Sequence, residues 1–457
     1  MKIVCEHSRC TGCSTCNDIC PTSAIKMRED GEGFIFPAVD QEKCINCKLC
    51  QKVCPIHHPE RIRENSLCDV DVHEGWALYD KIREVSSSGG IFGQLAHDLL
   101  ETGKWKVAGV DFDGHRAFHK LISSNKELEH LQNTKYVQSD ASLIYKEILK
   151  ELKLGTNILF SGTPCQVAGC YSYLNKKQYS GQLLTMEVVC HGVPSRSILE
   201  KSIEYNKAQK VESFRNKSKG WGYHSQQMTY VYEDGRKVVK SRDVDLFYRF
   251  FFGKKKLRTS CYQCPFAKFP RTADITIGDS WGTTNPSEIE RRKGLSLVIA
   301  NNKKAADLLT GSSNIHLREI GWFTEIQINR NLYTPFPPVS FVKERLNSNF
   351  IKKQLQSLNC DKFLKDTKLG FNEESLKDNR IKDVSRRIIQ KILYVLIGDG
   401  RLENIPPLRF EAILALIRIK GILSLKPSEQ ELAKKFVAIS KDVFEAKHGK
   451  LGIVSTK

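Results

Sequence analysis

Two copies of one cysteine pattern near the start of the chain restrict its fold more than any other feature. Each copy has the spacing C-x2-C-x2-C-x3-C-P, and the second lies 34 residues after the first. Nine of the 16 cysteines fall within the first 54 residues of a 457-residue chain that opens on no apolar signal-peptide run. Such a dense set of thiols is typical of metal binding in a reducing compartment rather than of a disulfide scaffold. The sequence therefore predicts a cytoplasmic protein with metal sites in its first segment.

The spacing also predicts the kind of metal site. Three thiolates in a short loop can bind one face of an iron–sulfur cubane, while the fourth, followed by proline, binds the other cluster. The ligands of the first predicted [4Fe-4S] cluster are Cys10, Cys13, Cys16 and Cys54. The ligands of the second are Cys44, Cys47, Cys50 and Cys20. Zinc is the alternative, but the third and fourth cysteines of each copy are out of step with paired C-x2-C ligands. Cys5 lies outside the pattern and is expected to be a small core residue.

Residues 1–63 resemble a two-cluster bacterial-type ferredoxin domain. The resemblance implies one-electron transfer at low potential and names no substrate. The polar stretch Pro59 to Asn65 is expected to end this domain.

From residue 75 to residue 345, apolar β-rich runs alternate with stretches of helical periodicity. Strands are expected at 76–78, 106–111, 157–160, 183–189, 273–277 and 295–300, and helices at 91–101, 142–151, 197–206 and 303–309. The runs 227–232 and 237–240, separated by a turn, predict an antiparallel hairpin. The mixture predicts an α+β chain with a central mixed α/β domain, not a regular doubly wound sheet.

Residues 346–457 are expected to form a basic helical C-terminal region. From residue 345 onward there are 23 Lys and Arg against 13 Asp and Glu, which is +10 of the formal +19. One interpretation is a solvated helical face packed against the body, and the other is a docking surface for an acidic partner or an anionic membrane. The apolar runs are shorter than the roughly 20 residues of a spanning helix. Neither a transmembrane segment nor a nucleic-acid-binding module is expected.

Four more cysteines stand at the ends of predicted strands in the central region: Cys165, Cys190, Cys261 and Cys264. They could supply four thiolates to a third [4Fe-4S] cluster or to a structural zinc ion. Four unrelated buried thiols are the third interpretation, and spacing alone leaves all three open. The stretch Ser86 to Gly90 precedes a predicted helix, where it could bind an anion or act as an ordinary N-cap.

The central segments resemble the coenzyme F420 hydrogenase/dehydrogenase beta-subunit family, which also includes ferredoxin-linked reductases of chlorophyll-type substrates. The matching stretches are 87–90, 135–139, 162–166, 190–192, 261–264 and 278–282. The resemblance implies an FAD-binding mixed α/β domain with its own [4Fe-4S] cluster on the four central cysteines. The FAD contacts that it implies are Ser87, Ser88, Gly89, Gly90, Lys135, Tyr136, Gln138, Gly162 and Thr163. An exposed strand or loop is the alternative for Lys135, Tyr136 and Gln138.

Several other residues have less specific expectations. His191 follows a predicted ligand, where it could support that ligand or relay a proton. Trp221 and Trp281 are expected to pack over a cofactor or in the core, and Cys68, Cys170 and Cys360 to be inert thiols. No catalytic residue is predicted.

The sequence thus predicts an iron–sulfur flavoprotein oxidoreductase that passes single electrons between a ferredoxin-like partner, or another redox subunit, and FAD. A small-molecule substrate, not identified, would then be reduced or oxidised by two electrons. Dedicated hydrogenase beta subunits need not carry this N-terminal domain or the basic tail, which puts coenzyme F420 in doubt as the substrate. One alternative is a non-catalytic electron-transfer subunit or adaptor, and another is a zinc-stabilised interaction protein.

Overall fold

The computed structural model describes residues 4–66, 69–218, 220–252, 257–281, 287–320 and 332. The chain divides into two compact units, Met1–Thr367 and Lys368–Lys457. All described residues belong to the first unit. The basic region 346–457, Cys68 and Cys360 lie outside them, so the expectations for these parts stay predictions.

The N-terminal segment repeats its backbone as well as its sequence. It contains α1 (Thr15–Ile19), a hairpin of β1 (Ile25–Glu29) and β2 (Ile35–Val39), and α2 (Leu49–Lys52). Gly12 and Ser14, before α1, have φ of 67° and 66°, and the residues 34 positions later, Asn46 and Lys48, have φ of 60° and 58°. The two cysteine loops therefore share one left-handed turn geometry, as expected if both wrap similar clusters.

The central region is built on a nine-stranded sheet of order β14-β3-β13-β12-β8-β7-β4-β5-β6. Its strands are β3 (Asp71–Ala77), β4 (Trp105–Phe112), β5 (Ala117–Ile122), β6 (Ser139–Asp140), β7 (Asn157–Gly162), β8 (Leu183–Val188), β12 (Ile275–Asp279), β13 (Ser296–Ala300) and β14 (Ile315–Glu319). The middle strands β4, β7, β8 and β12 are parallel, whereas β13, β3 and β14 pair antiparallel on one side and β5 pairs antiparallel with β4. This pairing confirms the predicted mixed α/β fold.

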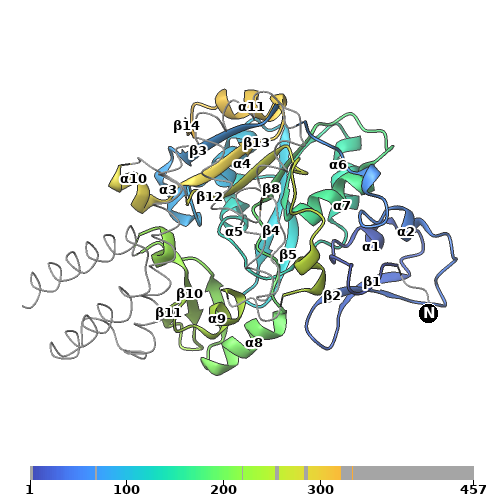
Figure 1. Cartoon of the computed structure of the whole chain (residues 1–457), viewed down its shortest axis with the longest axis horizontal. Helices are drawn as coiled ribbons and strands as arrows, with labels where there is room; N and C mark the ends of the chain where they lie inside the picture. Colours follow the sequence, from blue (N-terminus) through green and yellow to red (C-terminus); the bar gives the residue numbers. More distant parts are fainter. Residues whose placement is uncertain are drawn as a thin grey trace, which may run out of the picture. The chain divides into compact units, whose positions relative to one another are not determined.

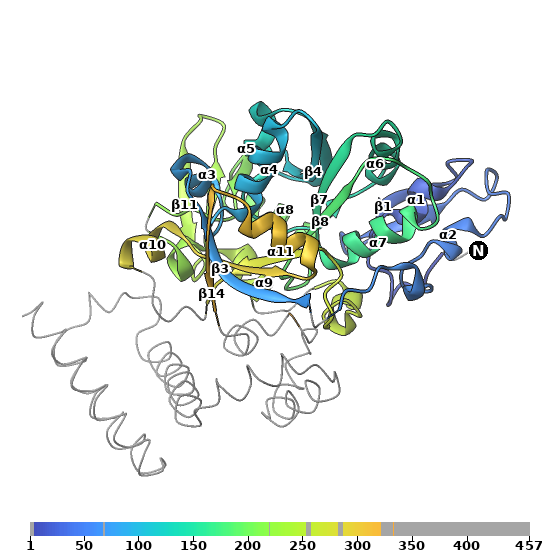
Figure 2. The same cartoon turned by 90° about the horizontal axis from the view of Figure 1, so that it is seen from above.

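Helices cover both faces of this sheet (Figures 1 and 2). One core contains residues of α4 (Ile91–Glu101), α5 (Leu128–Leu131) and α11 (Lys303–Thr310) together with Leu159 of β7. The opposite core contains residues of α6 (Ile144–Lys153) and α7 (Pro164–Leu174) together with Ile158 and Phe160, the strand neighbours of Leu159. Val53 of the N-terminal segment is buried in this second core. The N-terminal segment therefore packs on the α6–α7 side of the sheet.

A smaller sheet of order β11-β10-β9 packs with two helices beside the main one. It consists of β9 (Lys210–Ser213), β10 (Gln227–Val231) and β11 (Lys237–Ser241), and its core includes α8 (Arg196–Tyr205) and α9 (Leu246–Phe252). Short elements complete the described chain: α3 (Asp80–Val85), α10 (Glu288–Lys293) and the 3-10 turns 59–61, 125–127, 222–225 and 259–263. The β10–β11 pairing confirms the predicted hairpin.

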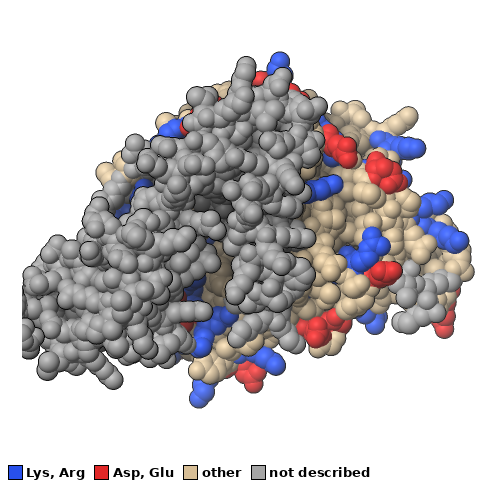
Figure 3. Space-filling model, viewed as in Figure 1, with Lys and Arg blue, Asp and Glu red and all other residues tan. Residues whose placement is uncertain are grey.

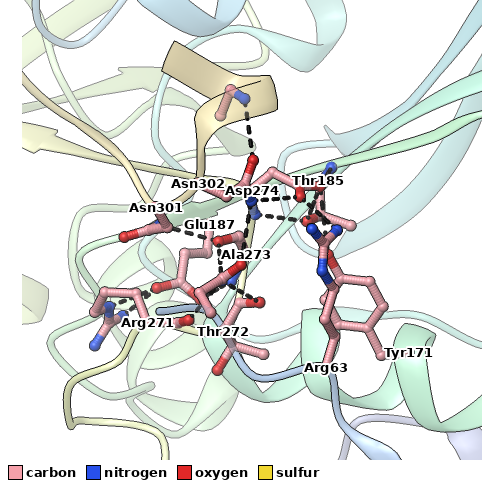
Figure 4. Close-up of polar contacts among 12 residues, drawn as sticks. Arg63, Tyr171, Thr185, Glu187, Arg271, Thr272, Ala273, Asp274, Asn301 and Asn302 are labelled. Carbon is pink, nitrogen blue, oxygen red and sulfur yellow. Dashed lines mark hydrogen bonds and ion pairs between the residues drawn. The ribbon is translucent and has the colours of Figure 1, made fainter. Parts of the chain in front are cut away.

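A buried polar network fixes the ends of β8 and β12 (Figure 4). Arg271 forms an ion pair with Glu187, and the two side chains are 1% and 0% exposed. Asp274 accepts hydrogen bonds from the Thr185 amide (2.8 Å), from Asn302 (2.9 Å) and from Arg63 of the N-terminal segment (2.8 Å). The network holds the segment that follows Cys264 against the parallel strands.

Most predicted elements are present with changed ends, and β3 begins well before the strand expected at 76–78. The elements that were not predicted include β5, β14, α9 and α7. In α7 the start of the helix is marked by its first residues. Thr163 and Gln166 form a capping box and Pro164 stands in its first turn, a signature that favours a helix start. No helix within the described part of the chain is long and apolar enough to cross a membrane. On the face in Figure 3, the basic and acidic side chains of the described part are interspersed and form no single-sign patch.

Candidate functional site

The four cysteines predicted for the first cluster line one small cavity in the N-terminal segment. Cys10, Cys13 and Cys16 come from the first loop, and Cys54 reaches the cavity from the second copy of the pattern. This arrangement brings together the four thiols that the predicted crossed ligation requires. Cys5 lies in the same cavity, with its donor atom within 4.8 Å of those of Cys54 and His57. It is therefore a buried neighbour of the first cysteine set.

The second set is arranged around its own core but is far more accessible. Cys20 is buried and packs near Cys44 and Cys50, which are half-buried, whereas Cys47 is exposed. The neighbouring Ile45 is 64% exposed. The two cysteine sets thus share one sequence pattern but differ in solvent access.

The backbone of the first cysteine loop is tied to the central region by side chains. The Cys10 carbonyl accepts hydrogen bonds from Arg258 Nε (2.7 Å) and Ser260 Oγ (3.0 Å). The Thr11 carbonyl accepts from Gln138 Nε2 (3.1 Å), and the Tyr145 hydroxyl lies 2.8 Å from the Cys13 carbonyl oxygen. A Cβ on Gly12 would meet Gln138 Nε2 at 2.4 Å. Only glycine therefore allows this close contact, besides suiting the positive φ.

The four central cysteines come together in a cavity of about 300 Å³. Cys165 lies just after β7 and Cys190 just after β8, at the carboxyl ends of neighbouring parallel strands. Cys261 and Cys264 reach the same cavity from the 3-10 turn that precedes β12. In open α/β sheets, ligands bind at the carboxyl ends of the strands.

The protonation of these thiols reflects burial and mutual proximity. Burial raises the pKa of Cys165 to about 12, and the neighbouring Cys264 adds to the increase. Burial likewise raises the pKa of Cys261 to about 12. For Cys190, burial raises the pKa well above its usual value, with further increases from Cys261 and Cys165. Four half-buried thiols that oppose one another's ionisation suit a metal centre, because a coordinated cation removes their protons.

The same cavity collects most of the residues that the resemblance implies for FAD. Eight of those nine residues line it, and they are Ser87, Ser88, Gly90, Lys135, Tyr136, Gln138, Gly162 and Thr163. Gly89 is absent from the lining, and a Cβ there would meet the Gly75 carbonyl oxygen at 2.4 Å. The structure thus brings the predicted flavin contacts and the third cysteine set into one space.

Some of these side chains already have protein partners. Ser87 Oγ accepts from the Thr134 amide (2.7 Å), and Gln138 is held by the first cysteine loop. Lys135 Nζ donates to the carbonyls of Gln132 (2.5 Å) and His130 (2.9 Å), and burial lowers its pKa to about 7. These contacts fix the wall of the cavity and leave Lys135 close to its titration point at neutral pH.

A second, larger cleft of about 1620 Å³ adjoins this cavity. Both are lined by residues 132–135 and by Arg215. Arg215 is paired with Asp279 (2.9 Å), and Lys217 in the cleft donates to the Ser88 carbonyl (3.1 Å). The cavity lies at the lower end of the size range of small-molecule sites, and the larger cleft exceeds that range.

The remaining singled-out residues have clear positions. His191 and Trp281 line the cavity, and Trp281 stacks on Trp221 with ring centroids 5.3 Å apart. Cys170 is fully buried in the α6–α7 core, as its inert role predicts. His119 is buried, and its Nε2 lies 3.2 Å from the Ser161 carbonyl; it carried no signal in the sequence.

Sequence reasoning also missed the residues that join the cysteine sites. Arg258, Ser260 and Tyr145 contact the first loop through its carbonyl groups. Thr11 lines both the first cavity and the central one, which makes it the wall between them. Proximity of Arg258 and Ser260 to Cys261 in the chain was the only available signal, since these contacts depend on tertiary packing.

Comparisons with known proteins agree with this arrangement. Residues 155–320 match the family formed by the C-terminal part of the coenzyme F420 hydrogenase/dehydrogenase beta subunit. Residues 9–57 match the 4Fe-4S dicluster domain. The chain is therefore an iron–sulfur electron-transfer protein of oxidoreductase type, and its central region is related to that beta subunit. The resemblance seen in the motifs is confirmed for both segments.

A comparison with solved structures gives a match described as "Xenon derivatization of the F420-reducing [NiFe] hydrogenase complex from Methanosarcina barkeri". The match has 16% sequence identity and a TM-score of 0.38, and covers 68% of this chain and 92% of the other. No curated protein matches the chain.

Proposed function

We propose that this protein is an iron–sulfur flavoprotein oxidoreductase that exchanges single electrons with a ferredoxin-like partner and two electrons with a small-molecule substrate. The observation that carries the proposal is the central cavity. It holds four cysteines from three segments and eight predicted flavin contacts, and it shares Thr11 with the first cysteine cavity. FAD, when bound, supplies the exchange between one-electron and two-electron chemistry.

The residues present suit both kinds of group. Each of the three cysteine sets offers four thiols, the number that a [4Fe-4S] cluster takes. The Thr11 hydroxyl is buried without a hydrogen-bond partner among the described residues, so it is available to a neighbouring acceptor. Lys135 places positive charge where the cavity opens into the larger cleft, which suits the phosphates of a dinucleotide.

Differences in burial favour an order of electron transfer. The second set, with exposed Cys47, is the one that a partner protein can approach. The first set is buried against the central region, and Thr11 lines both its cavity and that of the third set. Electrons from the partner would therefore pass from the second set to the first, then to the third set and the flavin cavity.

Iron and flavin analysis of the full chain, purified and reconstituted without oxygen, tests this proposal. Three clusters predict about 12 Fe per chain with matching sulfide, and the flavin pocket predicts bound FAD. Reduced ferredoxin should bleach that FAD. Cys264→Ser should lower the iron to about eight and leave the two N-terminal clusters intact. About eight Fe in the unaltered chain would remove the third cluster from the proposal.

The alternative is a non-catalytic electron-transfer subunit or adaptor. It is favoured by the protein contacts of Ser87 and Gln138, which use part of their hydrogen-bonding capacity within the chain. A chain that carries all its iron but retains no flavin would support this alternative. A chain without iron would instead support a zinc-stabilised interaction protein.

A further inference from the structure

Arg258 occupies an unusual place between the first and third cysteine sets. Its side chain is 1% exposed, and its guanidinium donates through Nε to the Cys10 carbonyl (2.7 Å) and through Nη1 to Gln138 Oε1 (3.0 Å). Its Cζ lies 4.0 Å from the centroid of the Phe36 ring. The main chain of Arg258 leads into the turn that carries Cys261, whose amide donates to the Arg258 carbonyl (2.9 Å). One residue therefore touches both cysteine sites.

Within the described part of the chain, no acidic side chain balances the charge of this guanidinium. Among the described residues the hydrogen bonds of its guanidinium go to a carbonyl and an amide oxygen rather than to a carboxylate, and its buried Nη2 has no hydrogen-bond partner. The positive charge instead acts electrostatically on the thiols of Cys10, Cys165 and Cys261. A buried charge without a counter-charge is strongly unfavourable. A neighbouring anion is therefore expected in the working protein, and an oxidised four-thiolate cluster carries about −2.

We infer that Arg258 is a positioning residue whose positive charge acts on both the first and the third cluster. This charge makes those two clusters easier to reduce than the second cluster. This inference rests on the proposed function, because it requires clusters at both sites. A reduced cluster carries one more negative charge than an oxidised one, so a nearby cation stabilises it more. The lysines of the second loop, Lys43, Lys48 and Lys52, are exposed to water, which screens their charge, and Cys47 is exposed as well. An electron that arrives at the second cluster is therefore transferred preferentially to the first and third clusters.

The test is a potentiometric titration of the reconstituted full chain, followed by electron paramagnetic resonance. Cys13→Ser and Cys264→Ser assign the midpoint potentials to the first and third clusters. Arg258→Gln keeps a donor but removes the charge. It should lower the reduction equilibrium constant of both clusters by at least tenfold, which is about 59 mV for a one-electron couple. The second cluster should shift much less.

Two further variants separate charge from packing. Arg258→Lys keeps the charge and should shift the potentials of both clusters by no more than half as much as Arg258→Gln does. Ser260→Ala removes the other donor to the Cys10 carbonyl and leaves the charge in place, so a smaller shift confined to the first cluster is expected. A matched control is Arg63→Gln, which removes a different link between the N-terminal segment and the central region, at Asp274 (2.8 Å), and should leave all three potentials unchanged.

Several results would overturn the inference. The inference is wrong if Arg258→Gln leaves the potentials unchanged or shifts only one of the two clusters. It is also wrong if Arg258→Lys shifts both potentials as far as Arg258→Gln does. If Arg258→Gln loses a cluster, Arg258→Lys decides the matter, since loss of the same cluster there would show a role in packing only. Absence of clusters from the unaltered chain would instead refute the proposed function.

Discussion

The buried ion pair between Glu187 and Arg271 allows a sharp prediction about the stability of the cavity wall. Glu187 stands in β8, two residues before Val189 and three before Cys190, and Arg271 precedes β12. Both side chains are essentially inaccessible to water. Glu187→Gln keeps the shape of the side chain but leaves the guanidinium buried without its counter-charge. Breaking such a pair costs about 3–5 kcal/mol.

The expected loss is about 3 kcal/mol, the lower end of that range. The glutamine amide oxygen can still accept from Arg271 Nε and from Thr276 Oγ1, which lie 2.6 and 3.0 Å from the carboxylate oxygen. Hydrogen exchange followed by mass spectrometry measures the local opening of strands. Amides of 183–188 and 271–279 should exchange roughly 100-fold faster in the variant, since each 1.4 kcal/mol is a factor of ten.

A surface pair provides the control for this experiment. Lys237 and Glu212 also form an ion pair, but their side chains are 56% and 44% exposed. Exposed pairs contribute about 0–1 kcal/mol, so Glu212→Gln should change exchange by less than about fivefold. The reasoning is wrong if the strand amides near Glu187 are accelerated in Glu187→Gln by no more than the strand amides near Glu212 are in Glu212→Gln.

Three further predictions concern pH and helix capping. Burial lowers the pKa of His119 from 6.5 to about 4, so the unfolded chain binds a proton that the folded chain rejects; stability should fall by about 3 kcal/mol as the pH drops from 6.5 to 4. His119→Phe should remove this part of the pH dependence in denaturant melts followed by fluorescence. Burial also lowers the pKa of Lys135 to about 7, so its positive charge is lost as the pH rises through 7. Flavin fluorescence titration should then show that FAD binds several-fold more weakly at pH 8 than at pH 6. The same titration of Lys135→Met should show no such difference. Thr163→Ala removes the capping box of α7 and should cost about 1 kcal/mol, seen as faster amide exchange over residues 165–170; equal exchange in both proteins would contradict this.

Local patterns in the sequence were sufficient for much of the fold. The β7, β8 and β13 strands are short apolar runs, and α4 begins and ends at the residues expected from its periodicity. These elements depend on the spacing of neighbouring side chains along the chain. The helix α7 was missed because it is buried on most of its sides and so lacks a clear apolar stripe, which leaves its capping residues as the main signal.

The cysteines show where local information ends. The spacing of each N-terminal copy determines a loop of fixed geometry, and Gly12 and Asn46 adopt the same left-handed turn in the two copies. The sequence also indicated that Cys54 crosses to the first set, because its position after the loop prevents it from reaching the nearer one. These conclusions need only the reach of a short chain.

Tertiary structure alone decided which copy is buried and what lies beside it. The first loop is covered by Gln138, Tyr145 and Arg258, which stand more than 120 residues away in the chain, whereas Cys47 in the second loop remains exposed. Likewise, the third cysteine set exists because the parallel strands β7 and β8 end at the same edge of one sheet. Sequence spacing determines contacts within a loop, but contacts between distant segments depend on how the cores pack, and no local pattern records that.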